Sequence, residues 1–325
     1  MKSFGGKLAI VTGGATGIGR ELVIQLASAG CSVATCDINE GALAETAKHA
    51  RDAAPGTVRV TAHRCDVSDP AQVTRFRDEA LARHETAHVN LLLNNAGITG
   101  GGSFVTDPAD EWERTFNVCW GGVYNCSRAF LPSLIAADES CIADISSVNG
   151  FWAALGPEVP HTAYSTAKFA IKGFTESLLT DLRVNAPHVQ VALIMPGHVG
   201  TDIFANSRRA LGHPAPDDMT PEDLEAARPA LSARLGLPPE QLTDDVVRMV
   251  IRAINDLFRD NASLTPAHAA TAILDGIRAG TWRILVGDDA KALDEAARQD
   301  PAALYDPTHP LTSLSAAIYG TPAQR

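Results

Sequence analysis

The sequence predicts an α/β fold in which helices cover both faces of a doubly wound, seven-stranded parallel sheet. Two observations support this fold class. Short apolar runs alternate with amphipathic stretches along residues 7–201, and the runs are nearly continuous, as in strands buried on both faces. A glycine-rich turn follows the first run. The 325 residues, 45% of them hydrophobic, suffice for one large domain or two smaller ones, and we expect a single domain with an inserted lid.

The first strand, at residues 7–12, is expected to end in a dinucleotide-binding turn of the Rossmann type. The turn is followed by an amphipathic helix that reaches about residue 29. Glycines let the backbone approach a pyrophosphate, and the helix N-terminus offers free amides. The spacing is G-x-x-x-G-x-G, and a turn of this kind can also be only a tight connection. The predicted binding residues are Gly13, Ala15, Thr16, Gly17, Ile18 and Gly19.

The second strand, at residues 32–36, ends at Asp37. An acid at this distance from the turn is placed to bind the adenosine ribose hydroxyls. It could also cap the next helix, at 40–49, although Asn39 could do the same. A 2′-phosphate would be repelled by the like charge of Asp37. Neither Thr16 nor Ile38 carries a positive charge that would offset this repulsion. The sequence therefore predicts a preference for NAD over NADP, with Arg20 expected on the helix surface.

The alternation of strands and helices continues to residue 286, interrupted by one insertion. Further strands are expected at 58–63, 89–93, 141–145, 189–195 and 282–286, and helices at 70–83, 110–136, 163–183 and 265–278. Thr265 and Pro266 form a helix start of the N-cap and N1 type.

Tyr164 and Lys168 are expected on one face of a helix, one turn apart. A nearby ammonium favours the ionised phenol, so the pKa of the tyrosine should fall from about 10. Lowering it to about 7 requires ~4 kcal/mol, and such a phenol can exchange a proton at neutral pH. Such a pair also occurs by chance on many helices, so its meaning depends on the rest of the chain.

Residues 202–264 contain six prolines and are predicted to form a lid over the cleft. Helical pieces are expected at 221–235 and 243–258, and the pair Arg208–Arg209 on a solvated face of the lid. Residues 288–325 should form a C-terminal extension beyond a domain of residues 1–287. We expect this extension to dock on the domain or at a subunit interface.

Composition excludes several classes of function. With 27 basic and 38 acidic residues the net charge is −11, which disfavours nucleic acid and anionic membranes as partners. No apolar run approaches 18 residues, and the N-terminus has no signal-peptide pattern. The six cysteines show neither C-x-x-C nor zinc spacing, so we expect no metal and buried, reduced thiols in a cytoplasmic protein.

Taken together, four stretches resemble the classical short-chain dehydrogenase/reductase family. They are Thr12-Gly13…Gly17-Ile18-Gly19, Asn94-Asn95-Ala96-Gly97, Ser147…Tyr164…Lys168 and Pro196-Gly197…Thr201. The resemblance covers the first strand through Thr201 and the helix and strand at 265–286. The step of 17 positions from Ser147 to Tyr164 is longer than is usual in the family, and the extra residues fall in a loop that should reshape the pocket.

The resemblance implies hydride transfer between nicotinamide C4 and a carbon that bears oxygen. It makes Tyr164 the general acid/base and Lys168 its pKa partner, while Ser147 binds the substrate oxygen and Asn117 holds a water. Besides the turn residues and Asp37, it implies cofactor contacts from Asp66, Val67, Asn95, Ala96, Gly97, Tyr164, Lys168, Pro196, Gly197, Val199 and Thr201. It also implies a homodimer or homotetramer.

The expected substrate is a small-molecule secondary alcohol or ketone with a hydrophobic body. Candidate pocket residues are Phe151, Trp152, Leu155, His161, His198 and Phe204. A non-catalytic, dinucleotide-sensing regulator on the same fold is the alternative, although it would be expected to lose Ser147, Tyr164 or Lys168. A sugar-nucleotide epimerase or dehydratase of the extended relatives fits the glycine spacing less well.

Overall fold

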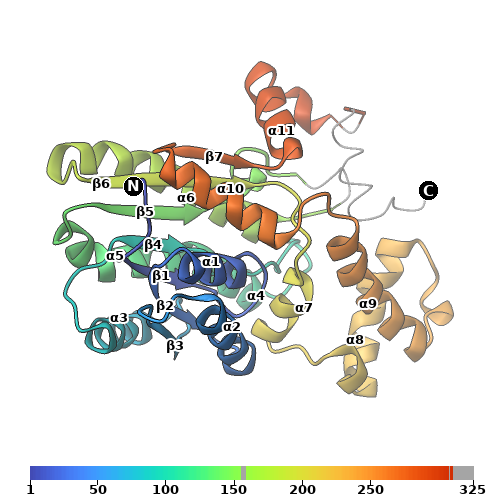
Figure 1. The fold of residues 1–325 in the computed structure, drawn as a ribbon. Helices are drawn as coiled ribbons and strands as arrows, with labels where there is room; N and C mark the ends of the chain where they lie inside the picture. The colour runs from blue at the N-terminus through green and yellow to red at the C-terminus, as the bar shows by residue number, and fades with distance from the viewer. Residues whose placement is uncertain (155–158, 307, 310–325) are drawn as a thin grey trace.

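The computed structural model describes residues 1–154, 159–306 and 308–309, with residues 233–234 described for the backbone alone. Its described part contains one seven-stranded, all-parallel sheet in the order β3-β2-β1-β4-β5-β6-β7 (Figure 1). The winding reverses between β1 and β4, where open α/β sheets bind ligands. The strands are β1 (Leu8–Thr12), β2 (Ser32–Asp37), β3 (Val60–Arg64), β4 (Leu91–Asn94), β5 (Ser140–Ile145), β6 (Val189–Pro196) and β7 (Arg283–Val286).

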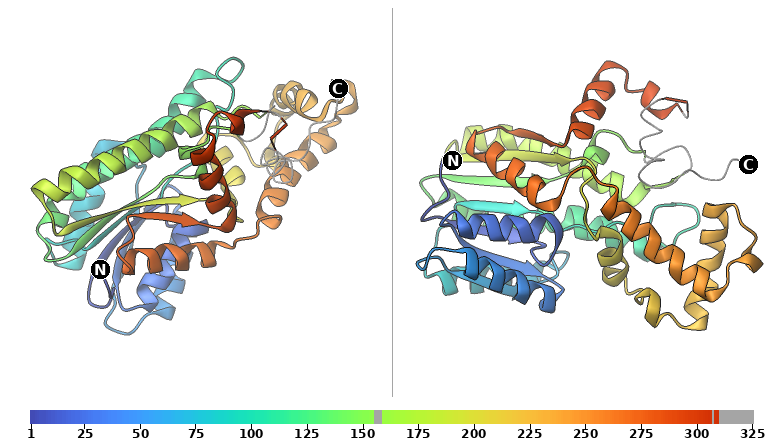
Figure 2. Two further views of the ribbon diagram at one scale, coloured as in Figure 1. Left: turned by 90° about the horizontal axis from the view of Figure 1, so that it is seen from above. Right: turned by 45° about the vertical axis from the view of Figure 1, so that its right-hand side comes forward.

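Helices cover both faces of the sheet, as predicted (Figure 2). One layer consists of α1 (Gly17–Ser28), α2 (Glu40–Ala53) and α10 (Pro266–Arg278). The other consists of α3 (Pro70–His84), α5 (Gly122–Ile135) and α6 (Thr162–Asn185), and α4 (Ala109–Phe116) packs on α6. Ala9 and Val11 join the first core, whereas Leu8 and Ile10 join the second. Side chains that alternate along β1 are thus apolar on both faces, which explains the continuous runs in the sequence.

Two strands begin later than expected, because their first residues bond elsewhere. The amide of Val58 donates to Pro55 O in a turn, and that of Val89 donates to Ser133 O. Neither residue therefore enters the ladder, and β3 and β4 begin two residues further on.

The helix predicted at 110–136 contains a π-helical turn, Asn117–Gly121, between α4 and α5. In this turn the amide of Gly122 bonds to Asn117 O, five residues back. Such turns insert one residue into a helix and are frequent at functional sites.

The inserted segment forms three helices: α7 (Ile203–Ala210), α8 (Pro221–Leu235) and α9 (Asp244–Asp260). Thr220 and Asp223 form a capping box at the start of α8, and Thr243 caps α9. Helices α8 and α9 pack around a small core of their own, formed by Met219, Leu224, Leu231, Leu242 and Val247. Both helices project beyond the carboxyl ends of the strands (Figures 1 and 2).

The described part of the C-terminal extension contains α11 (Asp288–Gln299), which packs against β7. All six cysteines are unpaired and buried, as expected. No helix in the described part of the chain has the length and apolar character needed to cross a membrane.

Candidate active site

One cavity runs along the carboxyl ends of the central strands, and α7 covers part of it. The structure places every residue predicted to contact the cofactor in its lining. These residues are Gly13, Ala15, Thr16, Gly17, Ile18, Gly19, Asp37, Asp66, Val67, Asn95, Ala96, Gly97, Tyr164, Lys168, Pro196, Gly197, Val199 and Thr201.

The glycine-rich turn is shaped by close backbone packing. Gly13 has φ +68°, and a Cβ added there would lie 2.8 Å from Ala96 Cα. A Cβ at Gly19 would lie 2.0 Å from Gly13 O, so a side chain at either position would break the turn. Asn95 Nδ2 holds the turn by donating to Thr12 O at 2.9 Å and Gly13 O at 3.1 Å. Contacts within the protein thus fix the shape of the turn.

Asp37 occupies the position expected of a ribose ligand. Its Oδ2 accepts from Ala15 N at 3.1 Å and its Oδ1 from Asn39 N at 2.9 Å. Asn39 caps α2 by accepting from Ala42 N, so Asp37 is not needed as the cap of that helix. Burial raises the pKa of Asp37, and the backbone amides partly oppose this rise. Arg20 binds Glu45 at 3.1 Å on the helix surface, as expected.

Sequence reasoning missed Arg114 as a neighbour of the predicted cofactor residue Asp66. Arg114 lines the cavity from α4 and pairs with Asp66 at 2.6 Å. Desolvation tends to raise the pKa of Asp66, but the bonds from Arg114 and Ser68 outweigh it and lower the pKa. This carboxylate is therefore fixed and ionised at the side of the cavity.

Tyr164 and Lys168 lie one turn apart on α6, as predicted. The Lys168 Nζ atom lies 5.2 Å from the centroid of the Tyr164 ring and donates to Ile145 O at 2.9 Å. Lys168 is buried, with 3% of its surface exposed, and burial lowers its pKa. The ammonium is thus held beneath the phenol by the end of β5.

Ser146 and Ser147 follow β5 and are bonded differently. Ser146 Oγ donates to Lys168 O at 2.8 Å, which joins the end of β5 to α6. Ser147 Oγ accepts from Asn149 N at 3.1 Å, a bond that leaves its hydroxyl proton available to donate. This difference favours Ser147 as the group that binds a substrate oxygen.

Asn117 opens the π-helical turn, but its side chain is exposed and is not among the cavity-lining residues. The next residue, Val118, lines the cavity, and Cys119 Sγ donates to Ile98 O at 3.2 Å. The turn therefore borders the site, and the water-holding role of Asn117 stays a prediction.

The aromatic residues expected to line the substrate pocket after Ser147 lie elsewhere. Trp152 is 3% exposed, packs on Leu293 and donates from Nε1 to Leu304 O at 3.1 Å. Phe151 packs on the same cluster. The prediction was wrong for both, because the C-terminal extension covers this loop and supplies the apolar contacts. Leu155 lies outside the described residues.

Among the remaining candidates, His161 contacts a predicted catalytic group. Its ring centroid lies 4.7 Å from that of Tyr164, and burial lowers its pKa to about 4, so the imidazole is neutral at pH 7. His198 and Phe204 both pack on Phe258, at 4.4 and 5.0 Å between centroids. Phe258 itself lines the cavity, whereas His198 and Phe204 are not among the lining residues.

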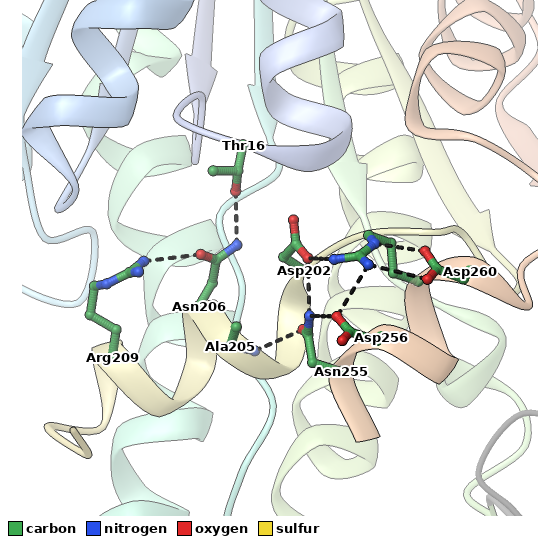
Figure 3. A network of polar contacts seen from close by, with 9 residues as sticks. Thr16, Asp202, Ala205, Asn206, Arg209, Asn255, Asp256 and Asp260 are labelled. Atoms are coloured by element: carbon green, nitrogen blue, oxygen red, sulfur yellow. Dashed lines mark hydrogen bonds and ion pairs between the residues drawn. The ribbon is translucent and has the colours of Figure 1, made fainter. Parts of the chain in front are cut away.

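The lid contributes residues that the sequence did not reveal. Ile203, Asn206, Arg209 and Ala210 of α7 line the cavity. Arg209 is exposed, as expected, and it borders the cavity as well. Arg208 instead turns into the lid and donates to Pro214 O at 3.2 Å. The N-terminal end of α7 is bonded to α9, because Asp202 Oδ1 accepts from Asn255 Nδ2 at 3.1 Å (Figure 3). The same oxygen pairs with Arg259 at 3.1 Å.

Comparison with known proteins agrees with this geometry. A family model described as short chain dehydrogenase matches residues 7–212. A putative oxidoreductase, SadH, from Mycobacterium tuberculosis is 32% identical over 298 residues, which are 92% of each chain. Human epidermal retinol dehydrogenase 2 is 33% identical over 204 residues, which are 62% of this chain and 63% of the relative.

A short-chain dehydrogenase/reductase from Burkholderia phymatum, solved in complex with NAD, superposes with a TM-score of 0.73. It is 29% identical, and the match covers 96% of this chain and 99% of the other. The matched region contains the glycine-rich turn, Ser147, Tyr164 and Lys168 within residues 7–212. The chain therefore belongs to the short-chain dehydrogenase/reductase family and is an oxidoreductase with a nicotinamide-dinucleotide-binding Rossmann fold.

Proposed function

We propose that the protein interconverts a secondary alcohol and a ketone with NAD as cofactor, and that Tyr164 is the general acid/base. One observation carries the proposal: Tyr164, Lys168 and Ser147 line the same cavity as the glycine-rich turn and Asp37. A phenol, a buried ammonium and a hydroxyl donor thus surround the place where a nicotinamide would lie. The non-catalytic alternative needs none of the three, and their convergence favours catalysis.

The residues present fit a dinucleotide. The turn lacks the Cβ atoms that would block a pyrophosphate, and the N-cap residue Thr16 makes no side-chain bond to the first amides of α1. Asp37 keeps acceptor capacity for ribose hydroxyls beside its two backbone bonds. Bound there, the nicotinamide supplies the hydride acceptor or donor. We propose that NAD is preferred over NADP, because the carboxylate of Asp37 would repel a 2′-phosphate.

In the direction of alcohol oxidation, Tyr164 takes the hydroxyl proton and Ser147 donates a hydrogen bond to the same oxygen. Lys168, held by Ile145 O, stabilises the ionised phenol. Asn117 is proposed to hold a water near the π-helical turn that passes the proton to solvent. In reduction, Tyr164 returns the proton to the carbonyl oxygen.

The substrate is proposed to have a hydrophobic body. Ile98, Val118, Ile203 and Phe258 form an apolar part of the cavity lining, in place of the aromatic residues predicted from sequence. One relative is named for retinol, an alcohol with a large apolar part. Both observations support an apolar alcohol or ketone as substrate.

The test is a panel of secondary alcohols with NAD, followed by NADH absorbance. We expect turnover with apolar members of the panel, and we expect small polar alcohols to react more slowly. Binding of NADH without turnover of any alcohol or ketone would support the dinucleotide-sensing alternative instead.

We also propose a homo-oligomer built on α5 and α6. Tyr124 on α5 and Phe169 on α6 are 44% and 41% exposed, large apolar groups that a partner subunit would cover. Light scattering should give a dimer or tetramer mass, and Phe169→Glu should lower it. A monomer mass for the wild type would overturn this proposal.

A further inference from the structure

The first lid helix, α7, presents one face to the cofactor cavity. Ile203, Asn206 and Ala210 are three and four residues apart, so they lie on the same side of the helix. All three line the cavity together with Arg209. Ile203 and Ala210 suit a cover for an apolar substrate, but an amide and a guanidinium do not. The two polar side chains call for a different ligand.

Asn206 ties this face of α7 to the glycine-rich turn. Its Nδ2 donates to Thr16 Oγ1 at 2.9 Å, and its Oδ1 accepts from Arg209 Nη1 at 3.1 Å (Figure 3). Thr16 is the N-cap of α1, yet its side chain makes no capping bond to that helix. The Thr16 side chain thus bonds to the lid and not to the first amides of α1, which keep their capacity to bind an anion.

Arg209 adds a full positive charge at the same end of the cavity. Among the described lining residues, the other cations are Arg114, which pairs with Asp66 at 2.6 Å, and Lys168, which is buried beside Tyr164. Arg209 donates to the neutral amide of Asn206, and its side chain is exposed at the cavity mouth. The positive charge of Arg209 also opposes the rise in the pKa of Asp37 that burial causes. Arg209 is therefore close to Asp37, at the end of the cavity where adenosine would bind.

We propose that α7 is a phosphate clamp, in which Arg209 donates hydrogen bonds to the diphosphate of the bound dinucleotide. Asn206 holds the guanidinium in place through its bond to Thr16. A guanidinium offers paired donors that match phosphate oxygens, and the diphosphate has no other free lid cation among the described lining residues. The inference rests on the proposed function, which supplies the dinucleotide. It means that the lid closes on the cofactor phosphates and not on the substrate alone.

Calorimetric binding of fragments tests the clamp without requiring turnover. ADP-ribose contains the diphosphate but no nicotinamide, and adenosine contains no phosphate. For Arg209→Gln we expect the Kd of ADP-ribose and of NADH to rise at least about tenfold, equivalent to about 1.4 kcal/mol. The Kd of adenosine should change less than about twofold. Arg252→Gln is the matched control, because it removes the same charge from an exposed lid residue outside the cavity lining.

The outcomes separate the clamp from the function on which it rests. If wild type binds ADP-ribose and Arg209→Gln binds it equally well, the clamp is wrong and the cofactor site stands. NADPH is titrated alongside, and a loss of affinity confined to NADPH would assign Arg209 to a 2′-phosphate and overturn its role at the diphosphate. If Arg252→Gln loses as much affinity for ADP-ribose as Arg209→Gln does, the effect is one of overall lid charge. That result would also overturn the clamp. Failure of wild type to bind NADH or ADP-ribose would overturn the proposed function itself.

Discussion

The cavity has a floor, formed by the carboxyl ends of the strands, the glycine-rich turn and α6, and a lid, formed by α7, α8 and α9. These two regions are held together in different ways. The floor is fixed by buried and half-buried groups: half-buried Asn95 is bonded to the glycine-rich turn, buried Lys168 to Ile145 O, and buried Ser146 to the backbone of α6. The lid has a small core of its own, and its ion pairs, such as Arg252 with Asp217, are exposed to solvent. Exposed pairs contribute little to stability, since solvent and salt screen them.

This contrast indicates that the floor orients the catalytic groups and that the lid controls ligand binding. A floor held by buried hydrogen bonds is preformed, so it can orient Tyr164 and Ser147 before any ligand arrives. A lid with few buried contacts can open at low free-energy cost. The first lid helix contacts the rest of the protein through the bond of Asn206 to Thr16 and through Ser207 Oγ, which accepts from Thr99 N at 2.8 Å, whereas α8 and α9 pack mainly on their own core. We therefore expect mutations in the floor to change chemistry and mutations in the lid to change ligand binding.

The largest effect is expected for Lys168→Ala, which removes a floor residue with two proposed roles. Turnover should fall about 10³-fold, within the range of acid–base catalysis, and the Kd of NADH should rise about tenfold. Steady-state kinetics and calorimetry measure the two effects separately. A variant that loses stability but keeps both constants would show that Lys168 is only structural.

The next effect concerns cofactor choice, which the floor should control through Asp37. Wild type should favour NAD over NADP by at least ~10²-fold in kcat/KM, equivalent to about 2.7 kcal/mol. Asp37→Ser should reduce this ratio, because the repulsion is removed while the positive charge of Arg209 remains nearby. A wild-type preference for NADP, or an unchanged ratio in the variant, would rule out Asp37 as the discriminating group.

A smaller effect is expected from the buried acid beneath the floor. Asp144 is fully buried and accepts from Asn94 Nδ2 at 2.7 Å and Thr175 Oγ1 at 2.8 Å, and burial raises its pKa to about 6. The unfolded pKa is about 3.9, so between pH 4 and 6 the folded state binds more protons. The contribution of Asp144 to the free energy of unfolding is therefore fully present below pH 4. It falls by about 2 kcal/mol as the pH rises from 4 to 6.

Urea unfolding of wild type and Asp144→Asn at pH 4 and pH 7 measures this loss. Asparagine does not titrate, so wild type should lose stability relative to the variant as the pH rises. A stability difference that is the same at both pH values would contradict the raised pKa.

The smallest effect is expected in the lid itself. Amide exchange in residues 203–240 should slow about tenfold when cofactor and substrate are added, while the strands of the floor should change little. Hydrogen–deuterium exchange with mass spectrometry resolves the two regions. Equal protection of the lid with and without ligands would exclude a gating role.

The same contrast explains what the sequence could predict. The floor depends on local patterns, such as the glycine spacing or Tyr164 and Lys168 one turn apart, and these patterns gave the strands, their order along the chain and the cavity lining. Arg209 and Arg114 reach the cavity through the packing of whole helices, which leaves no local signal beyond helical spacing. Trp152 was misplaced because the sequence did not show that residues near Leu304 return to cover it.

The most direct test of the proposed chemistry is the kcat of Tyr164→Phe, measured together with its Kd for NADH. Phenylalanine keeps the ring beside Lys168 and His161 and removes only the hydroxyl, so folding and cofactor affinity should be little changed. We predict a fall in kcat of at least 10²-fold, the scale of general acid–base catalysis, with the Kd for NADH within about twofold of wild type. Near-wild-type turnover in the purified variant would contradict the assignment of Tyr164 as the group that moves the proton.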